Sequence, residues 1–145
     1  MIRSMRNVFA DTLYWIALAN PRDQHHHRSV VITKQLSRSR ITTSDDVLSE
    51  FLTFFSGKGR HARKSAVMFT DQVLSNKNIE VITQSRESFS GALKLYRERY
   101  DKEYSFIDCV SMWIMKEKLG INEIITNDRH FEQEGFKILM KEGLS

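Results

Sequence analysis

The sequence contains little cysteine, proline or glycine. Among its 145 residues there are one cysteine, one proline and six glycines. The single cysteine, Cys109, excludes an intrachain disulfide framework and a cysteine zinc site within one chain. Its place in an apolar helical stretch is typical of a small buried hydrophobe. With one proline and no low-complexity run, no linker is expected, so we predict one domain over residues 1–145 in a reducing cytoplasm.

A long apolar run is also absent. No segment reaches the roughly 18 uninterrupted apolar residues that a membrane-spanning helix needs, so we expect no membrane span. Arg3 and Arg6 precede an apolar stretch at residues 8–19 and so resemble the start of a signal peptide. However, Asp11 interrupts that stretch and residues 20–22 form a poor cleavage site. We therefore expect no secretory signal.

The charge balance is modestly basic. The chain has 22 Lys and Arg against 18 Asp and Glu, a net charge of +4 and a pI near 9.3. A basic surface suits a polyanionic partner, but a charge of this size also serves solubility, and charge alone leaves both readings open. Two clusters are candidates for phosphate contacts or for solvated loops: Lys34, Arg38 and Arg40, and Lys58, Arg60, Arg63 and Lys64.

Short strand-like runs alternate with helical patterns. We expect strands at residues 7–10, 40–43, 79–82 and 123–126, and an edge strand at 136–139. We expect helices at residues 12–20, 24–38, 44–55, 60–75, 87–99, 106–119 and 129–134. This alternation predicts an α/β fold with three α/β/α layers and a central, mainly parallel sheet of four or five strands. In such sheets, ligands bind at the carboxyl ends of the strands.

Four acidic residues stand where such a fold gathers side chains. Asp11 directly follows the first strand-like run, and Asp128 follows the fourth. Glu50 and Asp108 lie in apolar helical stretches, where an unpaired carboxylate is costly. Carboxylates brought together repel one another, and the usual remedies are protonation or a bound divalent cation. The pattern therefore predicts a Mg²⁺ or Mn²⁺ site that performs phosphate chemistry.

Two of these acids also have ordinary roles as helix caps. Asp11 stands between a strand and a helix and is a good N-cap, although Thr12 can cap instead. Asp108 follows Ser105 by three residues, which is the spacing of a capping box. Capping and metal binding do not exclude each other.

The other two acids have equally simple alternatives. On a helical wheel Glu50 falls roughly 40° from Phe54, at the edge of the apolar face, where an ordinary boundary glutamate reaches solvent. Asp128 is a possible N-cap of the short helix that follows it, and the hydroxyl of Thr126 can point the same way. The joint arrangement of all four acids is more informative than any one position.

The order of these motifs resembles the PIN-domain nucleases. That family begins with a hydrophobic strand that ends in Asp, continues with a helical Glu after the second strand, and has two further acids near a late apolar helix and the next strand. The matching segments are residues 8–12, 42–51, 104–109, 125–131 and 135–136. The resemblance spans nearly the whole chain, and residues 101–136 are its most specific part. One departure is the set of large side chains Leu13, Tyr14 and Trp15 after the first Asp.

The resemblance implies a Mg²⁺- or Mn²⁺-dependent ribonuclease. Many small members resemble toxins of toxin–antitoxin pairs, which implies an RNA substrate, a cognate antitoxin protein and a homodimer. Carried over residue by residue, the implied catalytic and metal-binding residues are Asp11, Glu50, Asp108 and Asp128, supported by Thr126, Ser105 and Thr12.

Roles can be assigned within that set as expectations. We expect Asp11 and Asp108 to be direct ligands of the cation and Asp128 to bind a second cation or a bridging water. Glu50 is expected to act as a ligand or as a base that positions water, with Thr126 behind them. The histidines at residues 25–27 point about 100° apart on a helix and so form no i, i+4 ligand pair. We interpret them as a solvated helix start, with RNA contact or a pH-sensitive surface as the alternative.

Two other functions compete with a nuclease. A phosphotransfer domain also places Asp at a strand end, but the dehalogenase type needs an Asp where Leu13 stands. The receiver type needs a Lys after a late strand, and this chain has Asn127 and Asp128 in that place. A non-catalytic module that binds RNA or protein is the second rival, and four clustered acids argue against it because an inert site has no use for their repulsion.

Overall fold

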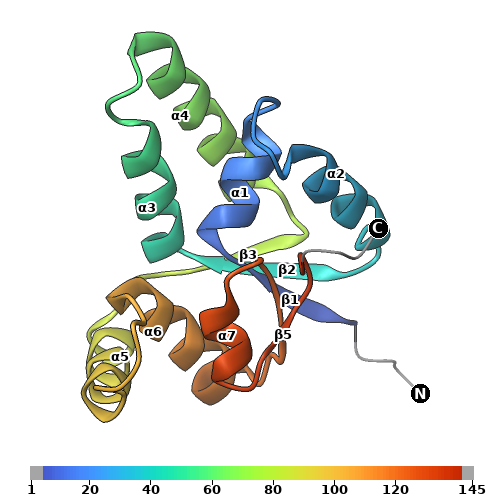
Figure 1. Cartoon of the computed structure of the whole chain (residues 1–145). Coiled ribbons are helices and arrows are strands. Elements are labelled where there is room, and N and C mark those ends of the chain that lie inside the picture. Colours follow the sequence, from blue (N-terminus) through green and yellow to red (C-terminus); the bar gives the residue numbers. More distant parts are fainter. Residues whose placement is uncertain (1–4, 142–145) are drawn as a thin grey trace.

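A five-stranded parallel sheet forms the centre of the computed structural model, which describes residues 5–141 (Figure 1). The strands are β1 (Asn7–Ala10), β2 (Arg40–Ser44), β3 (Ile79–Ile82), β4 (Glu123–Ile125) and β5 (Lys137–Ile138). They lie in the order β3-β2-β1-β4-β5, and every neighbouring pair is parallel. The predicted mainly parallel sheet is confirmed, with the fifth strand at an edge.

Helices cover both faces of this sheet. One layer holds α1 (Thr12–Ala19), α2 (His26–Gln35), α3 (Asp45–Phe55) and α4 (Arg60–Ser75), and the other holds α5 (Arg86–Glu98), α6 (Phe106–Trp113) and α7 (Arg129–Gln133) (Figure 1). The predicted three-layer α/β/α fold is confirmed. Across residues 5–141, no helix combines the length and the apolarity that crossing a bilayer requires.

The core lies on both sides of β1 and β4. Phe9, Ala10, Ile124 and Ile125 are completely buried, as expected of parallel strands that have helices over each face. Cys109 on α6 is also completely buried, which confirms its reading as a small core residue.

The register of β1 and β4 determines where the acidic residues lie. Phe9 pairs with Ile124 and Ala10 with Ile125, and the amide of Asp11 donates to the carbonyl of Ile125 at 3.4 Å. Both strands therefore end side by side. The residue that follows β1 is brought next to the segment 126–128 that follows β4.

The helix predicted over residues 106–119 differs from the observed one in its second half. The α-helical hydrogen bonding of α6 stops at Trp113 and continues as a π-helix, η1 (Ile114–Leu119). Gly120 then ends it in the left-handed region at φ 65°, a conformation that glycine adopts at little cost. The apolar pattern of the sequence does not distinguish an α-helix from a π-helix in this segment. In the observed π-helix Ile114 and Met115 are buried.

Close packing of α5 against α6 depends on one glycine. A Cβ added at Gly91 would overlap the indole ring of Trp113, so the two helices approach each other where α5 has no side chain. We expect Gly91→Ala to lower the free energy of unfolding by about 1–3 kcal/mol through overpacking. Helix propensity alone predicts a gain of about 1 kcal/mol. Urea denaturation measures the difference.

The neighbouring Ser90 provides a matched control. Ser90 is exposed on the same helix, so Ser90→Ala should leave stability unchanged or slightly higher. Trp113→Phe, which shortens the opposing ring, should reduce the cost of Gly91→Ala in the double variant. A Gly91→Ala protein that is more stable than the parent contradicts the packing argument.

Candidate metal centre

Asp11 is the most deeply buried of the four acids. It occupies the N-cap position of α1, but its side chain does not cap that helix. Instead, the hydroxyl of Thr126 donates to Oδ2 of Asp11 at 2.9 Å. Burial first, and then the charges of Asp108 and Glu50, raise the pKa of Asp11 to about 7 against the opposing hydrogen bonds. Residues of α3 and α6 thus contribute like charges that act on the buried carboxyl of Asp11.

Asp108 is held by the first turn of α6. Its amide donates to Oγ of Ser105 at 3.0 Å, and its Oδ2 accepts from the amide of Ser105 at 3.1 Å. The predicted capping box is therefore confirmed. Burial raises the pKa of Asp108, the Ser105 amide opposes that shift, and the charge of Asp128 raises the pKa again. The cap fixes this carboxylate beside two other acids.

Asp128 is the N-cap of α7, as the sequence suggested. Its Oδ1 accepts from the amide of His130 at 2.9 Å. The hydroxyl oxygen of Thr126, which donates to Asp11, accepts from the amide of Asp128 at 3.1 Å. Thr126 thus connects the segment after β4 to the acid that follows β1.

Glu50 approaches from the opposite layer. It is exposed on α3, and its charge contributes to the raised pKa of Asp11. Its expected position at the rim of the apolar face agrees with this exposure. The same wheel placed Phe54 on the buried face, which is wrong, because Phe54 is 43% exposed at the far end of the helix.

Thr12 does not act as the helix cap that the sequence allowed. It is 5% exposed, and its hydroxyl has no hydrogen-bond partner within residues 5–141. An unpaired buried hydroxyl costs free energy, and this one belongs to the residue directly after Asp11. It is an unsatisfied polar atom at the acidic cluster.

His130 is a member of the cluster that sequence reasoning missed. Its Nδ1 lies 3.4 Å from Oδ2 of Asp108 and 3.4 Å from Oδ1 of Asp128. One ligand atom from each of these three residues lies within 4.8 Å of the others. The available signal was the i, i+2 spacing from Asp128 in the first turn of a helix, which is too common to identify a site by itself.

The run of histidines is only partly the solvated helix start that was expected. His27 is exposed. However, Nδ1 of His26 lies 2.8 Å from the carbonyl oxygen of Ala17, and Nε2 of His25 lies 3.1 Å from the side-chain nitrogen Nδ2 of Asn127. The interpretation was wrong for His25 and His26 because tertiary contacts, which helical spacing does not contain, occupy their rings.

Within residues 5–141 the ligand atoms of Asp108, Asp128 and His130 come close enough to share one ion, and this group does not include Asp11 or Glu50. Asp11, Glu50, Asp108 and Asp128 are hard oxygen donors from four separate elements, and hard oxygens are what Mg²⁺ and Mn²⁺ bind. The raised pKa values of Asp11 and Asp108 show that the folded chain holds their negative charge at a cost. A cation removes that cost. The buried hydroxyl of Thr12, the residue directly after Asp11, has no partner within residues 5–141.

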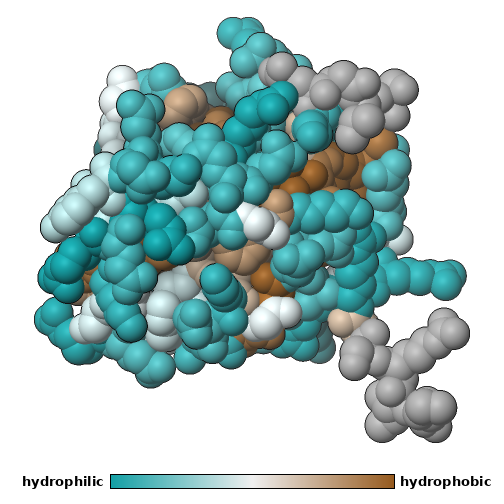
Figure 2. Space-filling model, turned by 60° about the horizontal axis from the view of Figure 1, so that its bottom comes forward, coloured by the Kyte–Doolittle hydropathy of each residue, from teal (hydrophilic) through white to brown (hydrophobic). Residues whose placement is uncertain are grey.

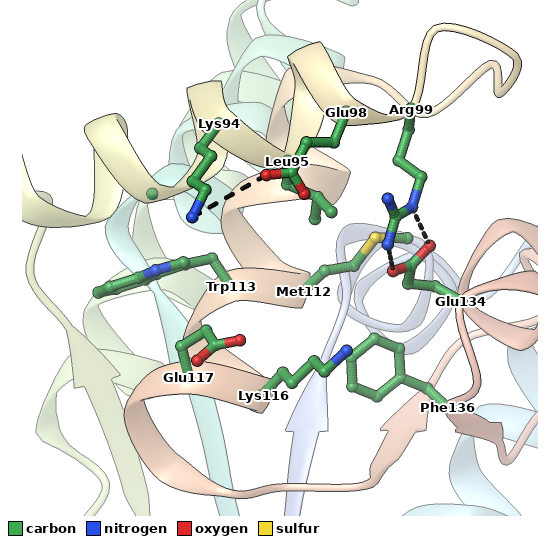
Figure 3. A pocket seen from close by; sticks show the side chains of 11 residues that line it. Lys94, Leu95, Glu98, Arg99, Met112, Trp113, Lys116, Glu117, Glu134 and Phe136 are labelled. Atoms are coloured by element: carbon green, nitrogen blue, oxygen red, sulfur yellow. Dashed lines mark hydrogen bonds and ion pairs between the residues drawn. The ribbon is translucent and has the colours of Figure 1, made fainter.

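A cavity on the α5–α7 side is not part of this cluster. That face is mostly hydrophilic, with several hydrophobic patches between the hydrophilic side chains (Figure 2). The cavity, about 300 Å³, lies between α5 and α6 (Figure 3). Its charged lining residues are Lys94, Arg99 and Lys116 with Glu98, Glu117 and Glu134. Arg99 and Glu134 are paired at 2.8 Å. Since the cations and acids are balanced, the cavity offers no net charge to a polyanion.

Comparisons with known proteins agree on one family. The model of the PIN domain matches residues 8–137. Two curated proteins, both named 23S rRNA-specific endonuclease VapC20 and from two strains of Mycobacterium tuberculosis, are 28% identical over 132 residues, which is 89% of this chain and 95% of theirs.

Solved structures show the same likeness. The crystal structure of Mycobacterium tuberculosis VapC20, described as a sarcin-ricin loop cleaving toxin, matches with a TM-score of 0.75 at 28% identity, over 89% of this chain and 95% of that one. VapBC2 from Rickettsia felis, bound to a DNA fragment from their promoter, matches with a TM-score of 0.61 over 92% of this chain and 97% of that one. At 17% identity the second match supports the fold alone.

Burial of Asp11 makes the stability of the metal-free protein depend on pH. The unfolded carboxyl ionises near its ordinary pKa of 3.8 and the folded one near 7, so between these values the folded state binds the extra proton. The free energy of unfolding should therefore fall as pH rises from about 4 to 7. The upper limit is about 4 kcal/mol, at about 1.4 kcal/mol per pKa unit. Urea denaturation in a chelator measures it.

Asp11→Asn should remove this contribution, and Asp101→Asn, at an exposed loop carboxylate, should retain it. At pH 7.5, added Mn²⁺ should stabilise the parent protein and not Asp11→Asn. The assignment fails if the parent and Asp11→Asn show the same pH dependence.

Proposed function

The chain belongs to the PIN domain family, and we propose that it is a Mg²⁺- or Mn²⁺-dependent endoribonuclease, the toxin of a toxin–antitoxin pair. The observation that supports this most directly is the buried carboxyl of Asp11, whose pKa is raised toward neutrality with Asp108 and Glu50 as like charges beside it. A cluster of this kind is suited to a divalent cation and to phosphodiester hydrolysis.

Each acid has a distinct role in this proposal. Asp11 and Asp108 bind the cation directly, Asp128 binds a second cation or a bridging water, and Glu50 is a ligand or a base that orients the attacking water. When bound, the cation lowers the pKa of a water and stabilises charge on the attacked phosphate.

Three neighbouring residues support the acids. Thr126 holds Asp11 through its hydroxyl at 2.9 Å, and Ser105 holds Asp108 through its amide at 3.1 Å. Thr12 directly follows Asp11 in the chain, and its buried hydroxyl has no hydrogen-bond partner within residues 5–141. These contacts exist in the metal-free chain, so the carboxylates are positioned before the cation binds.

A basic turn between α3 and α4 is suited to the RNA backbone. We use the term basic turn for Lys58, Arg60, Arg63 and Lys64. No acidic residue occurs between Glu50 and Asp71, so nothing in this segment offsets the four cations. The turn continues from the helix that carries Glu50, and cations there hold a polyanion while the acids act on it. The name of VapC20 specifies 23S rRNA as its substrate, and an RNA substrate for this chain is part of our proposal.

The partners are likewise proposed. VapBC2 of Rickettsia felis is named as a complex on promoter DNA, and we propose that this chain binds a cognate antitoxin and forms a homodimer in the cytoplasm. Large apolar side chains exposed on α1, α3 and α4 support a protein partner on that layer. They are Leu13, Phe54, Val67, Met68 and Leu74.

Loss of one carboxylate should abolish cleavage. We expect Asp108→Asn to reduce Mn²⁺-dependent cleavage of total RNA by about a hundredfold or more, because the cation that stabilises the transition state loses a charged ligand. Asn retains the hydrogen bond to Ser105, so circular dichroism should show an intact fold. Asp101→Asn, at an exposed site, should cleave normally. Normal metal-dependent cleavage by Asp108→Asn contradicts the proposal.

Charge on the basic turn should govern RNA affinity. Changing its four cations together to Gln should weaken binding of single-stranded RNA by about tenfold or more at low salt. It should also lower the slope of log Kd against log salt by up to about 3, since each phosphate contact contributes about 0.7. Binding is measured in the Asp108→Asn background so that the RNA stays intact.

The matched control removes the same charge elsewhere. Gln at Lys94, Arg97, Lys102 and Lys118, which lie on or after α5 and on η1, should leave the slope closer to the parent value. Equal losses in both quadruple variants would mean that net charge, rather than the basic turn, sets RNA affinity.

A further inference from the structure

We propose that His130 is a nitrogen ligand which, with Asp108 and Asp128, makes part of this centre selective for a first-row transition cation such as Mn²⁺ over Mg²⁺. The inference rests on the proposed function, since it concerns the cation of the same centre. It adds a residue that the family pattern of acids did not supply.

The spacing of the three donor atoms suits one ion. A cation with ligand distances of about 2.1 Å holds adjacent ligands about 3 Å apart and opposite ligands about 4.2 Å apart. Nδ1 of His130 lies 3.4 Å from a carboxylate oxygen of Asp108 and 3.4 Å from one of Asp128, and all three donors fit within 4.8 Å. Small side-chain rotations bring them to a common ion.

The same distances are long for a closed ion pair. A charged N–H···O contact is normally about 2.7–2.9 Å. Elsewhere in this chain, the nitrogen–oxygen distance is 2.8 Å in both the Arg99–Glu134 and the Arg6–Glu123 ion pairs. The imidazole therefore lies between two carboxylates without forming a short bond to either. That is the arrangement expected of three ligands around a shared position.

Both carboxylates keep acceptor capacity for an ion. The oxygens nearest His130 are Oδ2 of Asp108 and Oδ1 of Asp128, and each also accepts a capping bond from a backbone amide. A carboxylate offers about four lone-pair sites, so each of these oxygens can accept the capping bond and still bind an ion. The side chains of Asp108, Asp128 and His130 are 13%, 27% and 29% exposed, so the ion can enter from solvent.

A site with both nitrogen and oxygen ligands discriminates between Mn²⁺ and Mg²⁺. Mg²⁺ prefers oxygen and keeps several waters. Mn²⁺ also binds oxygen, but as a first-row transition ion it belongs to the series whose affinity for nitrogen-containing sites rises from Mn²⁺ to Cu²⁺. The oxygen atoms of Asp11 and Glu50 accept either cation. A position that includes His130 therefore gains affinity for Mn²⁺ and little for Mg²⁺.

Metal binding to the full chain, without RNA, tests the proposal. Free Mn²⁺ is measured by electron paramagnetic resonance, and Mg²⁺ by calorimetry, for the parent, His130→Phe and His130→Gln. We expect His130→Phe to weaken Mn²⁺ binding by about tenfold or more and Mg²⁺ binding by less than about threefold. Pulsed resonance of the Mn²⁺-loaded parent should show coupling to a ¹⁴N nucleus that is lost in both variants.

Controls separate a ligand from a positioning residue. His27→Phe, at an exposed histidine of α2, should retain the coupling and both affinities. The proposal is overturned if the parent shows no ¹⁴N coupling, if His130→Phe retains it, or if both metals weaken equally, because a residue that only orients Asp108 affects each cation alike. The resonance of the parent decides the question even if a variant fails to fold.

RNA cleavage distinguishes the two proposals. If nitrogen coupling is present and total RNA stays intact with either metal, His130 is a ligand and the ribonuclease assignment fails. If RNA is cleaved and the coupling is absent, the ribonuclease assignment stands and His130 is not a ligand.

Discussion

Repulsion among buried carboxylates is the constraint on which this structure depends. Asp11 is almost wholly enclosed, and its pKa is raised toward neutrality first by burial and then by Asp108 and Glu50. A fold gathers such groups at a cost to its own stability, since each ionised form is penalised in a low dielectric. A divalent cation reverses that penalty. The stability of the site and its chemistry are therefore two consequences of one arrangement.

Ordinary helix capping builds the site. Asp108 closes a capping box with Ser105, and Asp128 caps α7 through the amide of His130. Each cap satisfies backbone groups that the helix leaves unpaired, and each capping bond uses a single carboxylate oxygen. Structural and functional readings of these residues are therefore compatible. The parallel pairing of β1 with β4 then brings the segment that carries the Asp128 cap to the edge of the sheet where Asp11 follows β1.

The features of the fold and of the site that depend on local sequence pattern were predicted correctly from the sequence. Strand-like runs, apolar helical stretches and turn residues gave the layered sheet, and Asp11 and Asp128 followed from lying at strand ends. The role of His130 depends on how α6 and α7 pack, which no local spacing encodes. The same holds for His25 and His26, whose partners lie in other segments. The unpaired hydroxyl of Thr12 and the change from α6 to a π-helix follow from burial and backbone geometry, which helical periodicity does not report.

The most direct measurement is anomalous diffraction from crystals of the protein soaked in Mn²⁺. The account predicts at least one strong anomalous peak within about 2.5 Å of carboxylate oxygens of Asp11 and Asp108, with Asp128 around it and Glu50 facing it. A structure with Mn²⁺ bound only elsewhere, or with these carboxylates turned apart and no peak between them, would contradict the claim that the fold creates this acidic pocket for a cation.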